Sequence, residues 1–200
     1  MDKTMSPSMT DGQIDKLCDV VRSAVRKHQS EFASDAVQQA LGDKTLGQEL
    51  LVAFRKHVEA MSSMIVRTVS VSRNRTPQEA ITATGRNEYA DKKVVKTLPR
   101  DGEAEVTLYF FNLGQYATDD EAEKEFALRG LKPADPYALL AVNEADPTFA
   151  DEHSNCTHWK DKDGKWCYVA CHDWDVDRSV SVSRDDIDWG GGWWFAGSRK

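Results

Sequence analysis

Apolar residues recur every three or four positions through the first third of the chain, the spacing of one face of an α-helix. The first stripe consists of Ile14, Leu17, Cys18, Val21, Val25 and Phe32. The second, more regular stripe consists of Leu46, Leu50, Leu51, Phe54, Val58 and Met61. These patterns predict a helical segment over residues 10–62, preceded by a disordered start at residues 1–9 that is rich in serine and methionine.

Helix starts are marked by capping residues. Thr10 is followed three positions later by Gln13, and Thr76 by Glu79, with Pro77 at the first helical position. In such a capping box each side chain satisfies a backbone N–H that the first turn leaves open. Further helices are expected to begin near residues 118 and 135, where a threonine and an aspartate stand before helix-forming residues.

From Ile65 to Arg73 apolar and polar residues alternate with a period of two, which predicts a strand with one solvent-exposed face. Residues Glu105–Leu113 form the most apolar run and are expected to be a central strand. Two more strands are predicted at Arg178–Arg184 and Gly192–Gly197.

The stretch Asn155–His172 has the pattern of a β-hairpin, because the polar turn Asp161–Gly164 separates two runs of strand-forming residues. With that four-residue turn, Lys160 would pair with Lys165, Trp159 with Trp166, and His158 with Cys167. A change of one residue in loop length would reverse the faces of one strand relative to the other.

The fold class that follows is α+β. We expect the helical N-terminal segment to precede one α+β domain over residues 63–200. This domain has a mixed or antiparallel sheet, flanking helices and a C-terminal β-hairpin region.

Composition and charge narrow the classes of partner. Of the 200 residues, 40 % are hydrophobic and 30 % are charged, so the chain can form a core. Residues 1–75 carry 11 Lys/Arg against 9 Asp/Glu, and residues 76–200 carry 15 against 24. An acidic body disfavours broad binding to a phosphate backbone. With no visible export signal and no apolar run of membrane-spanning length, a cytoplasmic protein with free thiols and no membrane partner is expected.

Residues that bind zinc are concentrated around the hairpin. In the preferred register Cys156, His158 and Cys167 share one sheet face, and His153 lies nearby in sequence. Facing residues lie ~5 Å apart, close enough for His158 and Cys167 to share an ion. Cys171 would lie ~13 Å from Cys167 along a regular strand, too far for the same ion. The alternative is that the cysteines are small apolar residues of the core, in which case no cofactor is expected.

Two other chemistries have weaker sequence support. Asp173, Asp175 and Asp177 imitate the start of a calcium loop, but Arg178 and Arg184 stand where glycine and glutamate are required. A hydrolase site that combines histidine and carboxylate side chains would draw on Asp151, Glu152, His153 and His158.

All six tryptophans fall in the last 42 residues. Five of them are candidates for an aromatic binding surface: Trp159, Trp166, Trp174, Trp193 and Trp194. Aromatic residues dominate both cores and interface hot spots, so burial in the core is the alternative reading. As neighbours on a strand, Trp193 and Trp194 must point to opposite sides.

The chain resembles a set of uncharacterised bacterial proteins from about residue 30 to its end. The matching segments include Arg75–Ala80, Phe110–Gly114, Leu131–Tyr137, Asp151–His153, His158–Lys160 and Trp193–Gly197. The resemblance implies a bacterial protein and transfers no activity, ligand or functional residue.

The leading hypothesis is a non-catalytic protein-binding or accessory protein that binds another protein through the tryptophan-bearing β region or the N-terminal helices. One alternative is a zinc-binding protein or metal-dependent hydrolase centred on residues 153–172. A second is a nucleic-acid accessory protein, in which the N-terminal helices and the following Arg67, Arg73 and Arg75 contact phosphate.

Overall fold

The computed structural model describes residues 9–174, 177–184 and 188–200. Most of the predicted disordered start, residues 1–8, lies outside the described residues. The chain divides into two compact units, Met1–Met61 and Ser62–Lys200. Among the described residues no helix is both long and apolar enough to cross a membrane.

The first unit is helical, as predicted. Its elements are α1 (Asp11–Lys27), a 3-10 helix (Gln29–Glu31), α2 (Ser34–Gly42) and α3 (Leu46–Met61). The capping box of Thr10 and Gln13 is present at the start of α1. No residue of α1 or α2 is buried, and Leu41 and Leu50 are more than half exposed. In its described part, this unit therefore leaves its apolar stripes largely open to solvent.

The second unit contains an eight-stranded sheet and five helices within its described residues. The strands are β1 (Met64–Ser70), β2 (Asn87–Ala90), β3 (Glu105–Asn112), β4 (Leu131–Pro133), β5 (Asn155–Lys160), β6 (Trp166–Trp174), β7 (Asp177–Ser183) and β8 (Trp194–Arg199). The helices are α4 (Pro77–Thr82), α5 (Lys92–Val95), α6 (Asp119–Leu128), α7 (Pro136–Ala145) and α8 (Phe149–Glu152).

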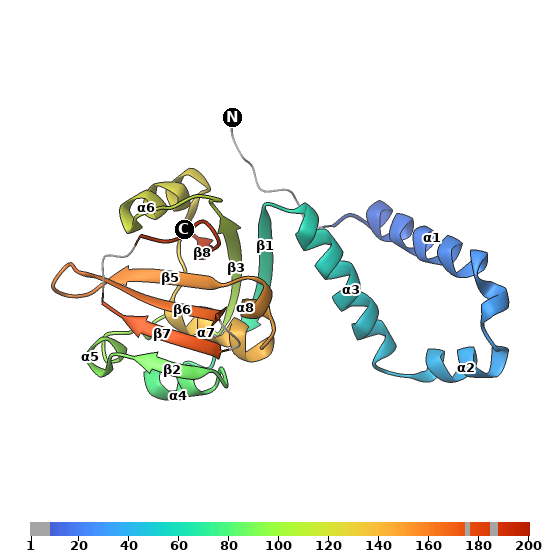
Figure 1. The fold of residues 1–200 in the computed structure, drawn as a ribbon, viewed down its shortest axis with the longest axis horizontal. Helices are drawn as coiled ribbons and strands as arrows, with labels where there is room; N and C mark the ends of the chain where they lie inside the picture. Colours follow the sequence, from blue (N-terminus) through green and yellow to red (C-terminus); the bar gives the residue numbers. More distant parts are fainter. Residues whose placement is uncertain (1–8, 175–176, 185–187) are drawn as a thin grey trace. The chain divides into compact units, whose positions relative to one another are not determined.

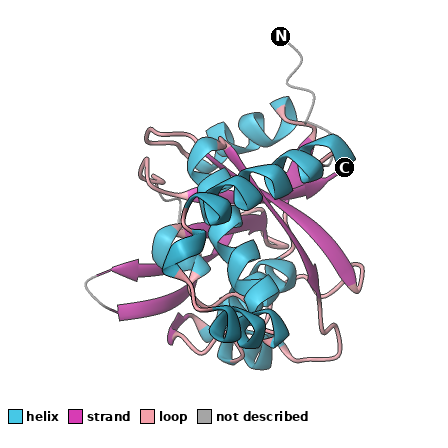
Figure 2. Cartoon of the chain, turned by 90° about the vertical axis from the view of Figure 1, so that its right-hand side faces the viewer, coloured by secondary structure: helices cyan, strands magenta, loops and turns pink. Residues whose placement is uncertain are grey.

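The sheet is mixed, and the strand order is β1-β3-β8-β5-β6-β7-β2, with β4 paired to β8 outside this path. The pairs β2–β7 and β5–β8 are parallel and the others are antiparallel. The long antiparallel pair of β6 and β7 can be followed in Figure 2. The predicted α+β class, with N-terminal helices followed by a mixed sheet and interspersed helices, is confirmed.

The two faces of the sheet are covered differently. Helices α4, α5, α7 and α8 contribute apolar residues to one core, which also takes Leu108, Phe110, Val169 and Val180 from the strands. On the opposite face α6 packs through Phe126, which contacts the rings of Phe111 and Phe195 edge-on. The sheet is thus buried on both faces near β3 and β8.

The predicted register of the β5–β6 hairpin is wrong by one residue. Trp166 pairs with Lys160, Cys167 with Trp159, and Tyr168 with His158. The turn closes between Asp161 and Lys165, because the Asp161 N–H donates to the Lys165 carbonyl oxygen at 2.9 Å. The loop therefore holds three residues instead of four and ends at Gly164, which adopts a left-handed φ of 76°. Because side chains alternate, His158 and Cys167 point to opposite faces of the sheet.

The sheet opens between β3 and β5. Strand β8 pairs with β3 only from Trp194 to Gly197, and with β5 only at Trp194 and Phe195. From Gly197 onward β8 pairs with β4 instead. Figure 1 shows the β1–β3 pair running across the direction of β5, β6 and β7. This divergence makes room for the cleft described below.

We expect Gly197→Ala to destabilise the second unit. A Cβ there would lie 2.9 Å from the Phe126 ring and 3.1 Å from the Lys132 carbonyl oxygen, and overpacking of this kind costs about 1–3 kcal/mol. Urea unfolding followed by tryptophan fluorescence measures the loss, since all six tryptophans lie in this unit. Gly192→Ala is the control, because its Cβ would have no neighbour within 4 Å. Equal stability of the two variants would contradict this account.

Candidate functional site

A buried histidine, His158 on β5, links the sheet to α6. Its Nδ1 lies 2.6 Å from Oδ1 of Asp119, and its Nε2 lies 3.1 Å from Oε1 of Glu123. The His158 side chain is only 2 % exposed, whereas that of Glu123 is 41 % exposed. The imidazole therefore joins a buried carboxylate on one side to a half-exposed carboxylate on the other.

Asp119 is held in place by the local structure at the start of α6. Thr118 caps this helix in a capping box with Glu121, and Asp119 follows as the first helical residue, where the helix dipole favours a negative charge. The preceding Ala117 forms an isolated antiparallel bridge with Trp189. That bridge brings Nε1 of Trp189 to Oδ1 of Asp119, to which it donates a hydrogen bond of 2.9 Å.

Aromatic rings enclose the imidazole. The Trp166 ring stacks on His158 with centroids 4.6 Å apart and an interplanar angle of 29°. Phe126 lies 5.7 Å away, centroid to centroid. The Lys160 ammonium sits 4.3 Å from the centroid of Trp166. The Lys160 ammonium is thus within cation–π distance of the Trp166 ring.

His158 has a raised pKa. Burial lowers the pKa of the imidazole, but the hydrogen bonds and charges of Asp119 and Glu123 outweigh burial and raise it above the ordinary 6.5. The same hydrogen bond lowers the pKa of Glu123. The two flanking carboxylates thus favour the protonated form of the imidazole, as expected when anions flank a buried base.

This geometry favours a positioning role over acid–base catalysis. A general base needs a free ring nitrogen within reach of a substrate proton. Here both nitrogens contact carboxylates, so the ring fixes the orientation of Glu123 instead. Glu123 in turn presents its carboxylate to an adjacent cleft.

The cleft has a volume of about 1160 Å³ and lies where the sheet opens between β3 and β5. Aromatic residues in its wall are Tyr109, Trp159 and Trp166. The remaining lining comes from the loop 99–103, the start of β3, α6, the segment 132–136, the end of β8, and His158 and Lys160 of β5. The volume exceeds the usual 300–1,000 Å³ of small-molecule sites.

Charges of both signs line the cleft, and the acidic residues include Asp120 and Glu123 of α6 as well as Asp135. Asp101, Glu103 and Glu105 belong to the loop before β3 and to its first residue. The cations come instead from β4, β5 and the end of β8, and are Lys132, Lys160, Arg199 and Lys200.

Arg73 anchors the acidic wall. Its Nε donates to the Glu103 carbonyl oxygen at 3.0 Å, and its two terminal nitrogens bind the Asp135 carboxylate at 2.7 and 3.0 Å. The guanidinium also lies against Gly102, where a Cβ would come within 2.6 Å of it. Asp135 caps α7 by accepting from Ala138 N, so a single arginine ties the loop to the core.

The four predicted metal ligands do not come together. Cys156 and His158 point to one face of the sheet and Cys167 to the other, while His153 packs between Phe149 and Trp194. Across the described residues, no group of three or more His, Cys, Asp or Glu side chains is arranged to hold a metal ion. Cys156, Cys167 and Cys171 are buried free thiols, and burial raises the pKa of Cys171 to about 12.

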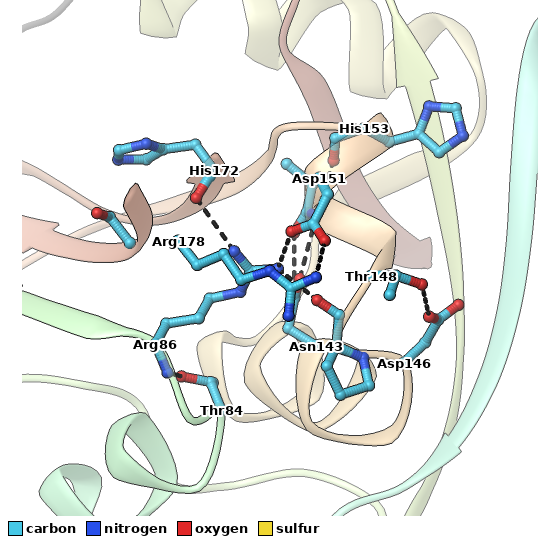
Figure 3. A network of polar contacts seen from close by, with 12 residues as sticks. Thr84, Arg86, Asn143, Asp146, Thr148, Asp151, His153, His172 and Arg178 are labelled. Carbon is cyan, nitrogen blue, oxygen red and sulfur yellow. Dashed lines mark hydrogen bonds and ion pairs between the residues drawn. The ribbon is translucent and has the colours of Figure 1, made fainter. Parts of the chain in front are cut away.

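Two of the carboxylates proposed for hydrolase and calcium sites, Asp151 and Asp177, have other partners. Asp151 accepts from Arg86, whose side chain is 1 % exposed, at 3.1 Å, and it also pairs with Arg178 (Figure 3). Arg86 further donates to the carbonyl oxygens of Pro147 and His172. This network ties the residue before β2 to α8, β6 and β7. Of the calcium-like aspartates, Asp175 lies outside the described residues, and Asp177 accepts from Asn87 and Tyr89.

The five candidate tryptophans fall into three places. Trp159 and Trp166 line the cleft. Trp174, which is 56 % exposed, and Trp193 form a surface cluster with His172, with ring centroids 4.2 to 5.9 Å apart. Trp194 packs against the main core. Trp193 and Trp194 thus lie on opposite sides, as the alternation predicts.

The arginines proposed for phosphate contact are engaged within the second unit. Arg73 binds Asp135, and Arg75 binds Glu144 through two hydrogen bonds of 2.5 and 3.0 Å. The Arg67 guanidinium lies 4.7 Å from the centroid of the Phe149 ring. These three side chains therefore do not form a common basic surface.

Sequence reasoning missed Asp119 and Glu123. The helix dipole already explains the acidic residues in the first turn of α6. The first turn by itself therefore gave no reason to look for a second role for them. One signal was present: Asp119 and Glu123 are four residues apart and share a helix face with Ala122 and Phe126, both of which are buried. Acidic residues on the apolar stripe of a helix call for a buried partner.

The stability of the second unit should depend on the charge of His158. Because its folded pKa lies above 6.5, the stabilisation is fully present below the unfolded pKa of ~6.5 and is lost as pH rises through the folded pKa. We therefore expect the stability difference between wild type and His158→Gln to shrink between pH 6 and pH 9, as measured by urea unfolding. His28→Gln is the control, since His28 is half-exposed. A pH-independent difference for His158→Gln would refute the assignment.

Asp119→Asn should destabilise the protein by about 3–5 kcal/mol, because it leaves a buried imidazolium with one of its charged partners removed. The neighbouring Asp120→Asn is the matched control, since Asp120 is exposed and such substitutions cost about 0.5 kcal/mol or less. Denaturant midpoints measured by tryptophan fluorescence compare the stability of the two variants. Equal midpoints would contradict the role of Asp119.

Neither a family model, nor a curated protein, nor a solved structure matches this chain. The resemblance to uncharacterised bacterial proteins therefore stays a prediction.

Proposed function

We propose that this chain is a non-catalytic binding protein whose cleft accommodates a segment of another protein. The observation that carries the proposal is the cleft itself, about 1160 Å³ in volume, with three aromatic rings and charges of both signs in its walls. Its size suits several residues of a polypeptide better than one small molecule.

The composition of the wall supports a protein partner. Tryptophan, tyrosine and arginine are the residue types that dominate interface hot spots, and the cleft contains Trp159, Trp166, Tyr109 and Arg199. Arg199 donates to the Tyr109 hydroxyl at 3.2 Å, which holds both side chains in a fixed arrangement. A wall that is ordered before binding loses less entropy when the partner arrives.

The adjacent imidazolium supports binding over catalysis. His158, the titratable side chain with the most distinctive environment in the wall, is locked between two carboxylates. Its contribution is to hold Glu123 and the Trp166 ring in position. A metal-dependent hydrolase has no comparable support, since the predicted ligands lie on different faces of the sheet.

Site-specific cross-linking tests the proposal. A photoreactive amino acid at Thr107, inside the cleft, should cross-link one recurring segment of a partner protein when the full chain is added to a bacterial lysate. The same substitution at Tyr116, which is 77 % exposed and outside the cleft, is the control. Mass spectrometry identifies the linked peptides. Identical products from both positions, or none specific to Thr107, would overturn the proposal.

A further inference from the structure

The strand register leaves backbone edges open in the cleft. Strand β3 pairs with β1 from Glu105 to Phe111, but with β8 only from Tyr109 to Asn112. Among the described strands, Glu105–Leu108 therefore have a partner on one side only. Unpaired strand edges of this kind are the template on which a further strand can add.

The opposite wall has the same property. Strand β5 pairs with β6 along its full length, but with β8 only at Asn155 and Cys156. Within the described sheet, Thr157–Lys160 thus have a strand partner on one side only. Thr157 is covered in part, since its hydroxyl donates to the Ala134 carbonyl oxygen at 2.7 Å.

The lining of the cleft shows that the β3 edge borders the open space. Glu105, Val106 and Thr107 all line it, although they are consecutive. Successive side chains of a strand point to opposite faces of the sheet. Three in a row can line one cavity only where the strand presents its edge to that cavity, so the backbone N–H and C=O groups are within reach of a ligand.

We propose that the partner segment binds as an extended strand added to the β3 edge at Glu105–Leu108, and that its side chains alternate between basic and apolar. This inference rests on the proposed function. Added strands gain affinity from main-chain hydrogen bonds and specificity from alternate side chains. The proposal therefore fixes both the conformation of the partner and its side-chain pattern.

The alternation follows from what each residue of β3 faces. Glu105 and Thr107 point to one face of the sheet, and Asp101 and Glu103 line the same cleft as these two residues. A strand residue directly opposite shares that face and is best basic, because opposite charges across a strand pair attract. Val106 packs toward the main core, so the residue opposite it is best apolar.

Defined peptides test this directly with the full chain. Acetylated, amidated hexapeptides of alternating lysine and valine, and of alternating glutamate and valine, are titrated at physiological salt by fluorescence anisotropy. We expect the lysine peptide to bind at least tenfold more tightly. A lysine peptide that is N-methylated at alternate residues on its pairing edge should bind at least tenfold more weakly, because it lacks the N–H donors of a strand pair. Amide hydrogen exchange should slow at Glu105–Leu108 in the complex.

Charge reversal supplies the matched pair of variants. Glu105→Lys should reduce lysine-peptide affinity by about tenfold, whereas Asp15→Lys makes the same charge change on exposed α1 and should leave it unchanged. Binding of the N-methylated peptide at full affinity, or no binding of the lysine peptide, would overturn the added strand. Cross-linking from Thr107 decides the proposed function separately, because that experiment presupposes no conformation of the partner.

Discussion

The contact between the His158 imidazole and the Asp119 carboxylate is the interaction on which the second unit most depends. It crosses from the centre of the sheet to the first residue of α6, and the Trp189 indole shares the same carboxylate oxygen. Three segments far apart in sequence therefore meet at one buried charge pair. Such a pair adds little net stability compared with an apolar cluster, but its loss leaves a charge without a partner. The charge pair therefore specifies one arrangement of β5, α6 and the segment that carries Trp189.

That arrangement also shapes the cleft. The aromatic stack on His158 fixes Trp166, and Arg73 fixes the loop on the opposite wall through Asp135. Both walls are thus set by buried or half-buried polar contacts, while the space between them comes from the divergence of β3 and β5. A rigid frame around an unfilled gap in a sheet differs from the usual enzyme pocket, where catalytic groups converge on one point.

Local signals predicted most elements but not the contacts that join them. The capping boxes at Thr10 and Thr76 placed two helices correctly, because caps depend on residues three positions apart. The predicted hairpin register was wrong because the register depends on the backbone conformation of Gly164, which the amino-acid sequence does not reveal. The pair of His158 and Asp119 spans 39 residues, and no local pattern connects such positions. The short strand β2 was also missed, since its parallel partner β7 lies about ninety residues later.

The position of β8 has a consequence for how this protein reaches its native state. This strand, Trp194–Arg199, is synthesised after the seven other described strands of the sheet, yet it lies between β3 and β5 and also pairs with β4. During translation the β1–β3 pair and the strands β5, β6, β7 and β2 are therefore synthesised before β8 is present to join them. Closure over so long a sequence separation is entropically costly and slow. Until then, partly formed strand edges are exposed to wrong pairing, so the nascent chain is at its most vulnerable shortly before β8 emerges from the ribosome.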